Sequence, residues 1–101
     1  MTTWFVTRHP GALAWASRHG ITAEHFVEHL SLAEITSQIG PGDTVRGILP
    51  VNLAAAVCQQ GARYQHLTVE LPAQMRGKEI DVNQLDALQA RLQIYHVEPL
   101  P

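Results

Sequence analysis

The chain has 101 residues, of which 46% are hydrophobic and 16% are charged, and its formal net charge at pH 7 is −2. These values describe one small globular domain and exclude a disordered tail. The slightly acidic balance argues against a general duplex-DNA-binding protein, but it allows a small anionic ligand held by a few local cations. Cys58 is the only cysteine, which excludes an intrachain disulfide and a cysteine zinc cluster, and we expect its thiol to be buried.

The sequence contains no apolar run of about 18 residues, the length of a membrane span, and its amino terminus lacks the pattern of a secretory signal. We therefore expect a cytoplasmic protein that acts without a membrane. Strand and helix patterns alternate along the chain, and we take them in order. The expected elements are a strand over 3–7, a helix over 11–18, a strand over 26–30, a helix over 32–39, a strand over 44–49, a helix over 51–60, a strand over 64–70, a loop over 72–78, a helix over 82–92 and a strand over 93–97.

Local signals support the expected helices. Ser31 and Glu34, like Asp81 and Gln84, have the spacing of a capping box, in which two side chains satisfy the first free N–H groups of a helix. Gly20 is a typical helix stop. The alternation predicts an α/β fold, with a mostly parallel sheet, helices on both faces and right-handed crossovers.

The segment 2–13 carries the first candidate site. An apolar strand runs into Arg8 and His9, and Pro10 and Gly11 then open an alanine-rich helix. In α/β proteins, ligands bind at the carboxyl ends of strands, beside helix N-termini that favour anions. Arg8 can bind a phosphate through two hydrogen bonds, His9 can transfer protons near neutral pH, and backbone N–H groups from Gly11 onward face the same place. The alternative is a solvated Arg8 and a His9 without a special role.

Two further segments are expected at the same edge of the sheet. Asn52 follows the expected strand 44–49, where it either contacts a ligand or caps the helix that begins there. Arg76, Gly77 and Lys78 follow the strand 64–70 in a loop whose glycine allows close backbone approach, and the alternative is a solvated loop. Arg8, Arg76 and Lys78 are three of only seven Lys and Arg residues. Their placement predicts an anionic ligand.

The segment 25–29 reads His-Phe-Val-Glu-His and matches the inverted zinc-protease pattern. That chemistry requires both histidines on one face of a helix and a third ligand. As a strand, the segment places His25 and His29 on one face and Glu28 on the other. We therefore expect neither a metal ion nor another cofactor, and a zinc hydrolase is the weakest alternative.

The segments 3–12, 42–45, 47–54 and 71–79 together resemble a family of small CRISPR-associated proteins, the ancillary proteins of about a hundred residues found beside type III interference complexes. The resemblance implies one Rossmann-like domain, similar to a CARF domain, over residues 1–101. It also implies a ring nuclease, which linearises cyclic oligoadenylate, chiefly cyclic tetra-adenylate, as a homodimer without a metal ion and so turns off the type III response. The alternatives are a protein that binds the ring without cutting it and a protein that docks on a CRISPR effector.

For such a ring nuclease, we expect a ribose 2′-hydroxyl to attack its own adjacent phosphodiester and to leave a 2′,3′-cyclic phosphate. His9 is the candidate proton carrier, and Arg8 and Lys78 would stabilise the charge that develops on the phosphate. The expected binding residues are Gly11, Asn52, Arg76 and Gly77. A dimer would bring six cations to the four phosphates of cyclic tetra-adenylate.

Overall fold

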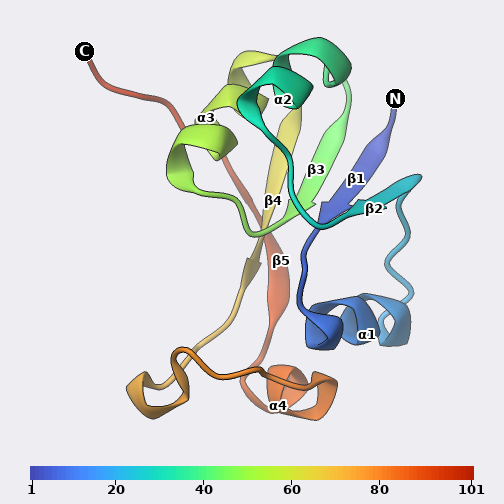
Figure 1. Ribbon diagram of the computed structural model, residues 1–101, viewed down its shortest axis with the longest axis vertical. Coiled ribbons are helices and arrows are strands. Elements are labelled where there is room, and N and C mark those ends of the chain that lie inside the picture. Colours follow the sequence, from blue (N-terminus) through green and yellow to red (C-terminus); the bar gives the residue numbers. More distant parts are fainter.

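Strands and helices alternate along the chain, as the sequence predicts (Figure 1). The structure is a computed structural model that describes residues 1–101. Its elements are β1 (Thr3–Val6), α1 (Pro10–Arg18), β2 (His25–Val27), α2 (Leu32–Gln38), β3 (Thr44–Gly47), α3 (Val51–Gln59), β4 (Arg63–Thr68), the 3₁₀ helix η1 (Ala73–Met75), α4 (Val82–Ala87) and β5 (Arg91–Tyr95). None of the helices is both long enough and apolar enough to cross a membrane.

The five strands form one sheet in the order β2-β1-β3-β4-β5. The strands β1 to β4 are parallel, and β5 runs antiparallel to β4. This confirms the predicted α/β fold with a mostly parallel sheet. Because the carboxyl ends of parallel strands meet at one edge, the connections after β1, β2 and β3 all begin at the same edge of the sheet.

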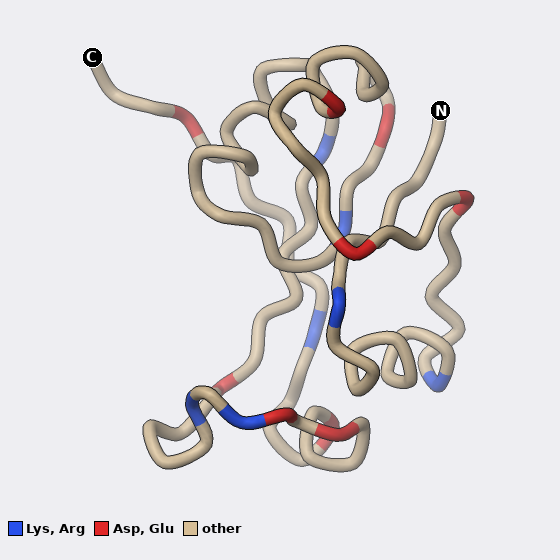
Figure 2. The backbone as a smooth tube through the Cα atoms, viewed as in Figure 1, with Lys and Arg blue, Asp and Glu red and all other residues tan.

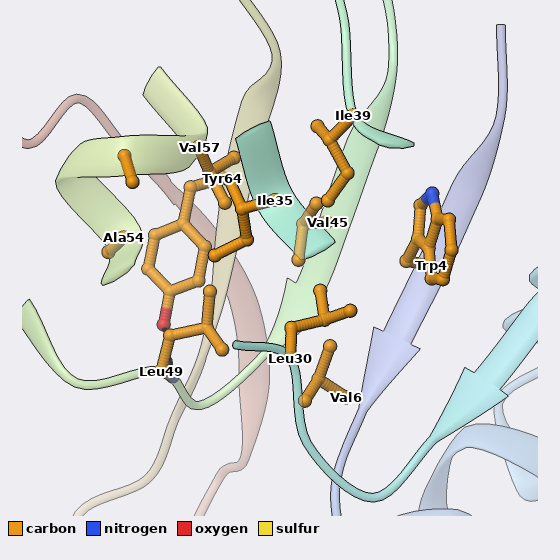
Figure 3. Packing of buried hydrophobic residues seen from close by; sticks show 11 residues of the cluster. Trp4, Val6, Leu30, Ile35, Ile39, Val45, Leu49, Ala54, Val57 and Tyr64 are labelled. Carbon is orange, nitrogen blue, oxygen red and sulfur yellow. Dashed lines mark hydrogen bonds between the residues drawn. The ribbon is translucent and has the colours of Figure 1, made fainter. Parts of the chain in front are cut away.

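Helices cover both faces of the sheet, as predicted. The face under α2 and α3 is filled by the larger core cluster, whose 11 buried residues are drawn in Figure 3. The opposite face packs against α1 and α4. Strand β1 contributes to the core clusters on both faces of the sheet, because Trp4 and Val6 belong to the larger cluster and Phe5 belongs to the cluster under α1 and α4. In Figure 1 the pair α2 and α3 accordingly lies apart from the pair α1 and α4.

Both predicted capping boxes are present. The Ser31 Oγ accepts a hydrogen bond from the Glu34 N–H at 3.1 Å, and the Ser31 N–H donates to the Glu34 carboxylate at 3.0 Å. The same reciprocal pair joins Asp81 and Gln84 at 2.8 and 2.9 Å. These contacts set the first residues of α2 and α4.

The end of α4 differs from the prediction. The helix ends at Ala87 rather than at residue 92, and β5 begins at Arg91 rather than at residue 93. Gln89 adopts a left-handed conformation, with φ of 60°, which ends the helical turn. Leu92 then pairs with Leu67 of β4 and packs in the core beneath α1 and α4. Cys58 also differs from expectation, since it is half-buried rather than buried.

Candidate anion-binding site at the carboxyl ends of the strands

The order of the strands places a crevice between β1 and β3. These strands are neighbours, but the chain continues from β1 into α1 on one face and from β3 into α3 on the other. Connections that diverge in this way leave an opening at the carboxyl edge, which is where ligands bind in open α/β sheets. Figure 1 shows the two connections leaving the strand ends in different directions. A cleft of about 450 Å³ opens here, and its lining includes Arg8, His9, Glu28, His29, Ile48 and Leu49.

A second cleft, of about 390 Å³, lies on the other side of His9. It is formed between the connection after β1 and the segment that joins β4 to α4. Thr7, His9 and Ile48 line both clefts. Lys78 and Glu79 are the charged residues of the second cleft, whose remaining lining is mostly apolar. His9 therefore lies between two clefts of mixed lining, of which the second is the more apolar.

The imidazole of His9 is held by Glu79. Its Nδ1 lies 3.2 Å from both carboxylate oxygens of Glu79, although 70 residues separate the two along the chain. The His9 backbone N–H donates to the Thr7 hydroxyl oxygen at 3.1 Å. The hydrogen bonds of the His9 ring involve Nδ1 alone, so Nε2 is free to meet a ligand.

Gly11 has a packing function that the sequence analysis did not predict. A Cβ added at this position would collide with the backbone oxygen of Ile80. The absent side chain thus lets the segment before α4 pack directly on the first turn of α1. This close approach brings Glu79, the neighbour of Ile80, to His9. The packing role of Gly11 does not depend on whether Gly11 also contacts a ligand.

The basic side chains divide into paired and unpaired groups. Arg18 pairs with Asp86 at 2.8 Å and Arg91 with Glu70 at 3.1 Å, while Arg46 donates to Gln65 and to a backbone carbonyl. The side chains that make neither an ion pair nor a hydrogen bond are those of Arg8, Arg63, Arg76 and Lys78. Arg63 begins β4, at the opposite edge of the sheet. Three of the four unpaired cations therefore follow the carboxyl ends of strands, where an anion would bind.

The same edge also carries two carboxylates that the sequence reasoning did not place in the site. Glu28 lines the first cleft together with Arg8, and Glu79 lines the second together with Lys78. In Figure 2 basic and acidic positions are interspersed, and the segment between β4 and α4 carries both signs. The site is thus a mixed one rather than a purely cationic cup. The sequence did hold one sign of this mixture. Lys78 and Glu79 are adjacent, so a loop that brings Lys78 to a ligand also brings the Glu79 carboxylate close.

Two of the predicted binding residues lie outside both clefts. Asn52 is the second residue of α3 and is exposed, and the N-cap of this helix is Pro50. The interpretation of Asn52 as the helix cap is therefore wrong, because the Leu53 and Ala54 N–H groups bond to the Pro50 carbonyl. Arg76 is exposed directly after η1. Gly77 does line the second cleft.

The histidines of the segment 25–29 are used differently from those of a zinc protease. The His25 ring stacks on Trp4, with ring centroids 4.2 Å apart. His29 follows β2 and lines the first cleft. No three side chains among His, Cys, Asp and Glu are grouped as metal ligands.

A buried hydroxyl supports the connection after β3. The Leu49 N–H donates to Tyr64 Oη at 3.0 Å, and Tyr64 Oη lies 2.7 Å from His66 Nδ1. Figure 3 shows the Tyr64 hydroxyl beside Leu49. Burial raises the pKa of Tyr64 and lowers the pKa of His66, so both side chains are neutral at physiological pH.

Residues 4–98 match the protein family described as "Putative CRISPR-associated protein (Cas_VVA1548)". The chain belongs to this family. The matched range includes every residue that lines the two clefts and all three unpaired cations at the carboxyl edge. The expectation of a CRISPR-associated protein is confirmed. No curated protein and no solved structure matches the chain.

Proposed function

We propose that this CRISPR-associated protein binds cyclic oligoadenylate, chiefly cyclic tetra-adenylate, and linearises it, which switches off type III signalling. The observation that carries the proposal is the position of His9 at the β1/β3 crevice, with three unpaired cations in the connections that follow β1 and β4. A cyclic oligonucleotide offers phosphates to these cations. It also has ribose hydroxyls whose protons a histidine can accept.

Binding is assigned to a homodimer. Arg8, Arg76 and Lys78 of each chain would give six cations around the four phosphates, and a ring with twofold symmetry suits two identical chains. Val51 and Ile48 support an interface here, because both are large exposed apolar residues in or next to the connection after β3. The carboxylates of Glu28 and Glu79 limit the positive charge, which favours a ligand that also contributes neutral groups such as bases and riboses.

The proposed reaction is an internal transfer at phosphorus. The 2′-oxygen of one ribose forms a bond to the adjacent phosphorus, and the bond from that phosphorus to the 5′-oxygen of the next nucleotide breaks. The proton of the 2′-hydroxyl passes to Nε2 of His9, and the departing 5′-oxygen takes a proton from water, so that a 2′,3′-cyclic phosphate and a 5′-hydroxyl result. His9 then returns its proton to the solvent. Arg8 and Lys78 stabilise the additional negative charge on the phosphoryl oxygens. The proposed reaction needs neither a metal ion nor an oxidant.

The decisive experiment offers excess cyclic tri-, tetra- and hexa-adenylate to the purified protein, with and without EDTA, and identifies the products by mass. We expect repeated turnover of the tetra-adenylate ring to linear products with 2′,3′-cyclic phosphate ends in both conditions. Protection of the ring at one equivalent per dimer would instead identify a binding protein. A chain with no affinity for any ring would fit a protein that docks on a CRISPR effector.

The role of His9 is tested by His9→Ala. We expect single-turnover cleavage to slow by about 10²- to 10⁴-fold, the usual contribution of a positioned proton carrier, while ring binding persists. His96→Ala is the matched control, because His96 is exposed and its side chain makes no hydrogen bond. Cleavage by His9→Ala within a few-fold of wild type would restrict His9 to binding.

A further inference from the structure

We propose that Glu79 is a positioning residue that fixes the tautomer of His9, with the proton on Nδ1 and the lone pair of Nε2 directed to the ligand. The contact itself is independent of the protein's activity, but its effect on catalysis rests on the proposed function. His9 is a useful base in the ring-opening step only when Nε2 is unprotonated. Glu79 would thus determine which nitrogen is available.

The geometry supports one direction for this hydrogen bond. Both carboxylate oxygens of Glu79 lie 3.2 Å from Nδ1 of His9. An ionised carboxylate only accepts hydrogen bonds, so Nδ1 is the donor. In the neutral ring one nitrogen carries the hydrogen and the other carries the lone pair, which places the lone pair on Nε2.

Backbone packing fixes Glu79 opposite His9. The next residue, Ile80, packs its carbonyl oxygen on Gly11, two residues after His9. The residue after that, Asp81, is locked by its capping box at the start of α4. The same two chain segments therefore meet at two adjacent points, His9 with Glu79 and Gly11 with Ile80. These contacts hold the backbone of Glu79 beside His9, so that its carboxylate is within reach of the imidazole.

The pair is a poor source of stability. The side chains of His9 and Glu79 are 53% and 66% exposed, and ion pairs at such exposure contribute little to folding. The other charged or titratable side chains around His9 are Arg8, Glu28 and His29 in the first cleft and Lys78 in the second. Among them, Glu79 alone bonds to the ring. The contact with Glu79 therefore orients the imidazole of His9 and contributes little to the stability of the fold.

The experiment measures the ¹⁵N shifts of the His9 ring in the full-length protein at about pH 8, above the ordinary histidine pKa of about 6.5. His9→Ala assigns the signals. We expect a protonated Nδ1 and an unprotonated Nε2 in the wild type, and a shift of population toward the opposite tautomer in Glu79→Ala. Glu79→Gln should give an intermediate population, because an amide can either accept from Nδ1 or donate to it, and Glu98→Ala controls for the loss of one exposed charge. A wild type with its proton mainly on Nε2, or no change in Glu79→Ala, would overturn the proposal.

Kinetics separate this proposal from the proposed function. In an active enzyme, Glu79→Ala should lower kcat roughly 10- to 100-fold, the range typical of residues that orient a metal-bound histidine, and should leave KM within a few-fold. Glu79→Gln should recover part of kcat. If the wild type cleaves no ring while its spectra show the expected tautomer, the proposed function fails and the assignment of Glu79 stands. If the wild type cleaves the ring and Glu79→Ala has an unchanged kcat, the positioning role is refuted.

Discussion

The Tyr64 hydroxyl accepts a hydrogen bond from the Leu49 backbone N–H at 3.0 Å, deep in the larger core cluster. Tyr64 is only 3% exposed, and Leu49 lies in the connection after β3 that lines the first cleft. A single buried oxygen thus joins the core to the candidate site. Without it, the Leu49 N–H would be buried and without a partner, because this connection lies outside any strand or helix.

Tyr64→Phe removes that oxygen and keeps the ring. We expect the free energy of unfolding to fall by about 1–3 kcal/mol, because a buried N–H loses its partner. The measurement is urea unfolding followed by circular dichroism. Tyr95→Phe is the matched control, since Tyr95 is 42% exposed and its hydroxyl bonds only to the exposed Gln93, so its stability should match the wild type. Equal stabilities for the two variants would show that the Leu49 N–H finds another partner.

His66 should make the stability depend on pH. Burial lowers the pKa of His66 in the folded state below its ordinary value of about 6.5. The unfolded chain therefore binds this proton more readily, and stability falls as the pH drops below about 6.5, until the folded state is protonated as well. The test compares urea midpoints at about pH 7.5 and pH 5.5 for the wild type, His66→Gln and His96→Gln. His66→Gln should lose less stability over this range than the wild type and His96→Gln. Equal losses in all three proteins would contradict a lowered pKa for His66 in the folded state.

Gly11 can be tested by the addition of a single methyl group. Gly11→Ala would place its Cβ against the Ile80 carbonyl, and we expect a loss of about 1–3 kcal/mol, the usual cost of overpacking. Gly40→Ala is the matched control, because a Cβ there meets open space and the backbone has no left-handed strain. Urea unfolding measures both. If Gly11→Ala were as stable as Gly40→Ala, the contact between α1 and the segment before α4 would be looser than the structure shows.

Local patterns predicted most of the fold, and non-local contacts set the rest. The capping boxes at Ser31 and Asp81 involve side chains three residues apart, so the sequence shows them directly. The early end of α4 depends on a left-handed residue that is not a glycine and on a strand that pairs with β4, and neither leaves a local pattern.

The candidate site was likewise predicted where it depends on local patterns and missed where it depends on non-local contacts. The carboxyl-edge position of Arg8 and His9 follows from the alternation of strands and helices, which the sequence displays. The contact between His9 and Glu79 depends on the close approach of Ile80 to Gly11, which joins segments 70 residues apart. No spacing rule in the sequence contains that information. Glu28 was missed for a similar reason, since its place in the cleft depends on where β2 ends.

The unpaired cations provide the sharpest test of ligand binding. In a His9→Ala background, which separates binding from cleavage, we expect Arg8→Gln and Lys78→Gln each to weaken the affinity for cyclic tetra-adenylate about tenfold, or ~1.4 kcal/mol. Arg63→Gln is the matched control, because this cation is also exposed and unpaired but begins β4 at the opposite edge of the sheet. Arg63→Gln removes the same charge from the whole protein as the other two substitutions. Long-range attraction between the protein and the phosphates would therefore affect all three variants alike.

The measurement is isothermal titration of the dissociation constant at two salt concentrations. Arg63→Gln should bind within about twofold of its parent, and the losses in Arg8→Gln and Lys78→Gln should shrink as salt rises, because screening weakens the contacts that these variants lack. Equal losses for all three would mean that the ring responds to net charge. A normal affinity in Arg8→Gln and Lys78→Gln together with a loss in Arg63→Gln would move the ligand to the amino-terminal edge of the sheet, where Arg63 and His96 line a different cleft.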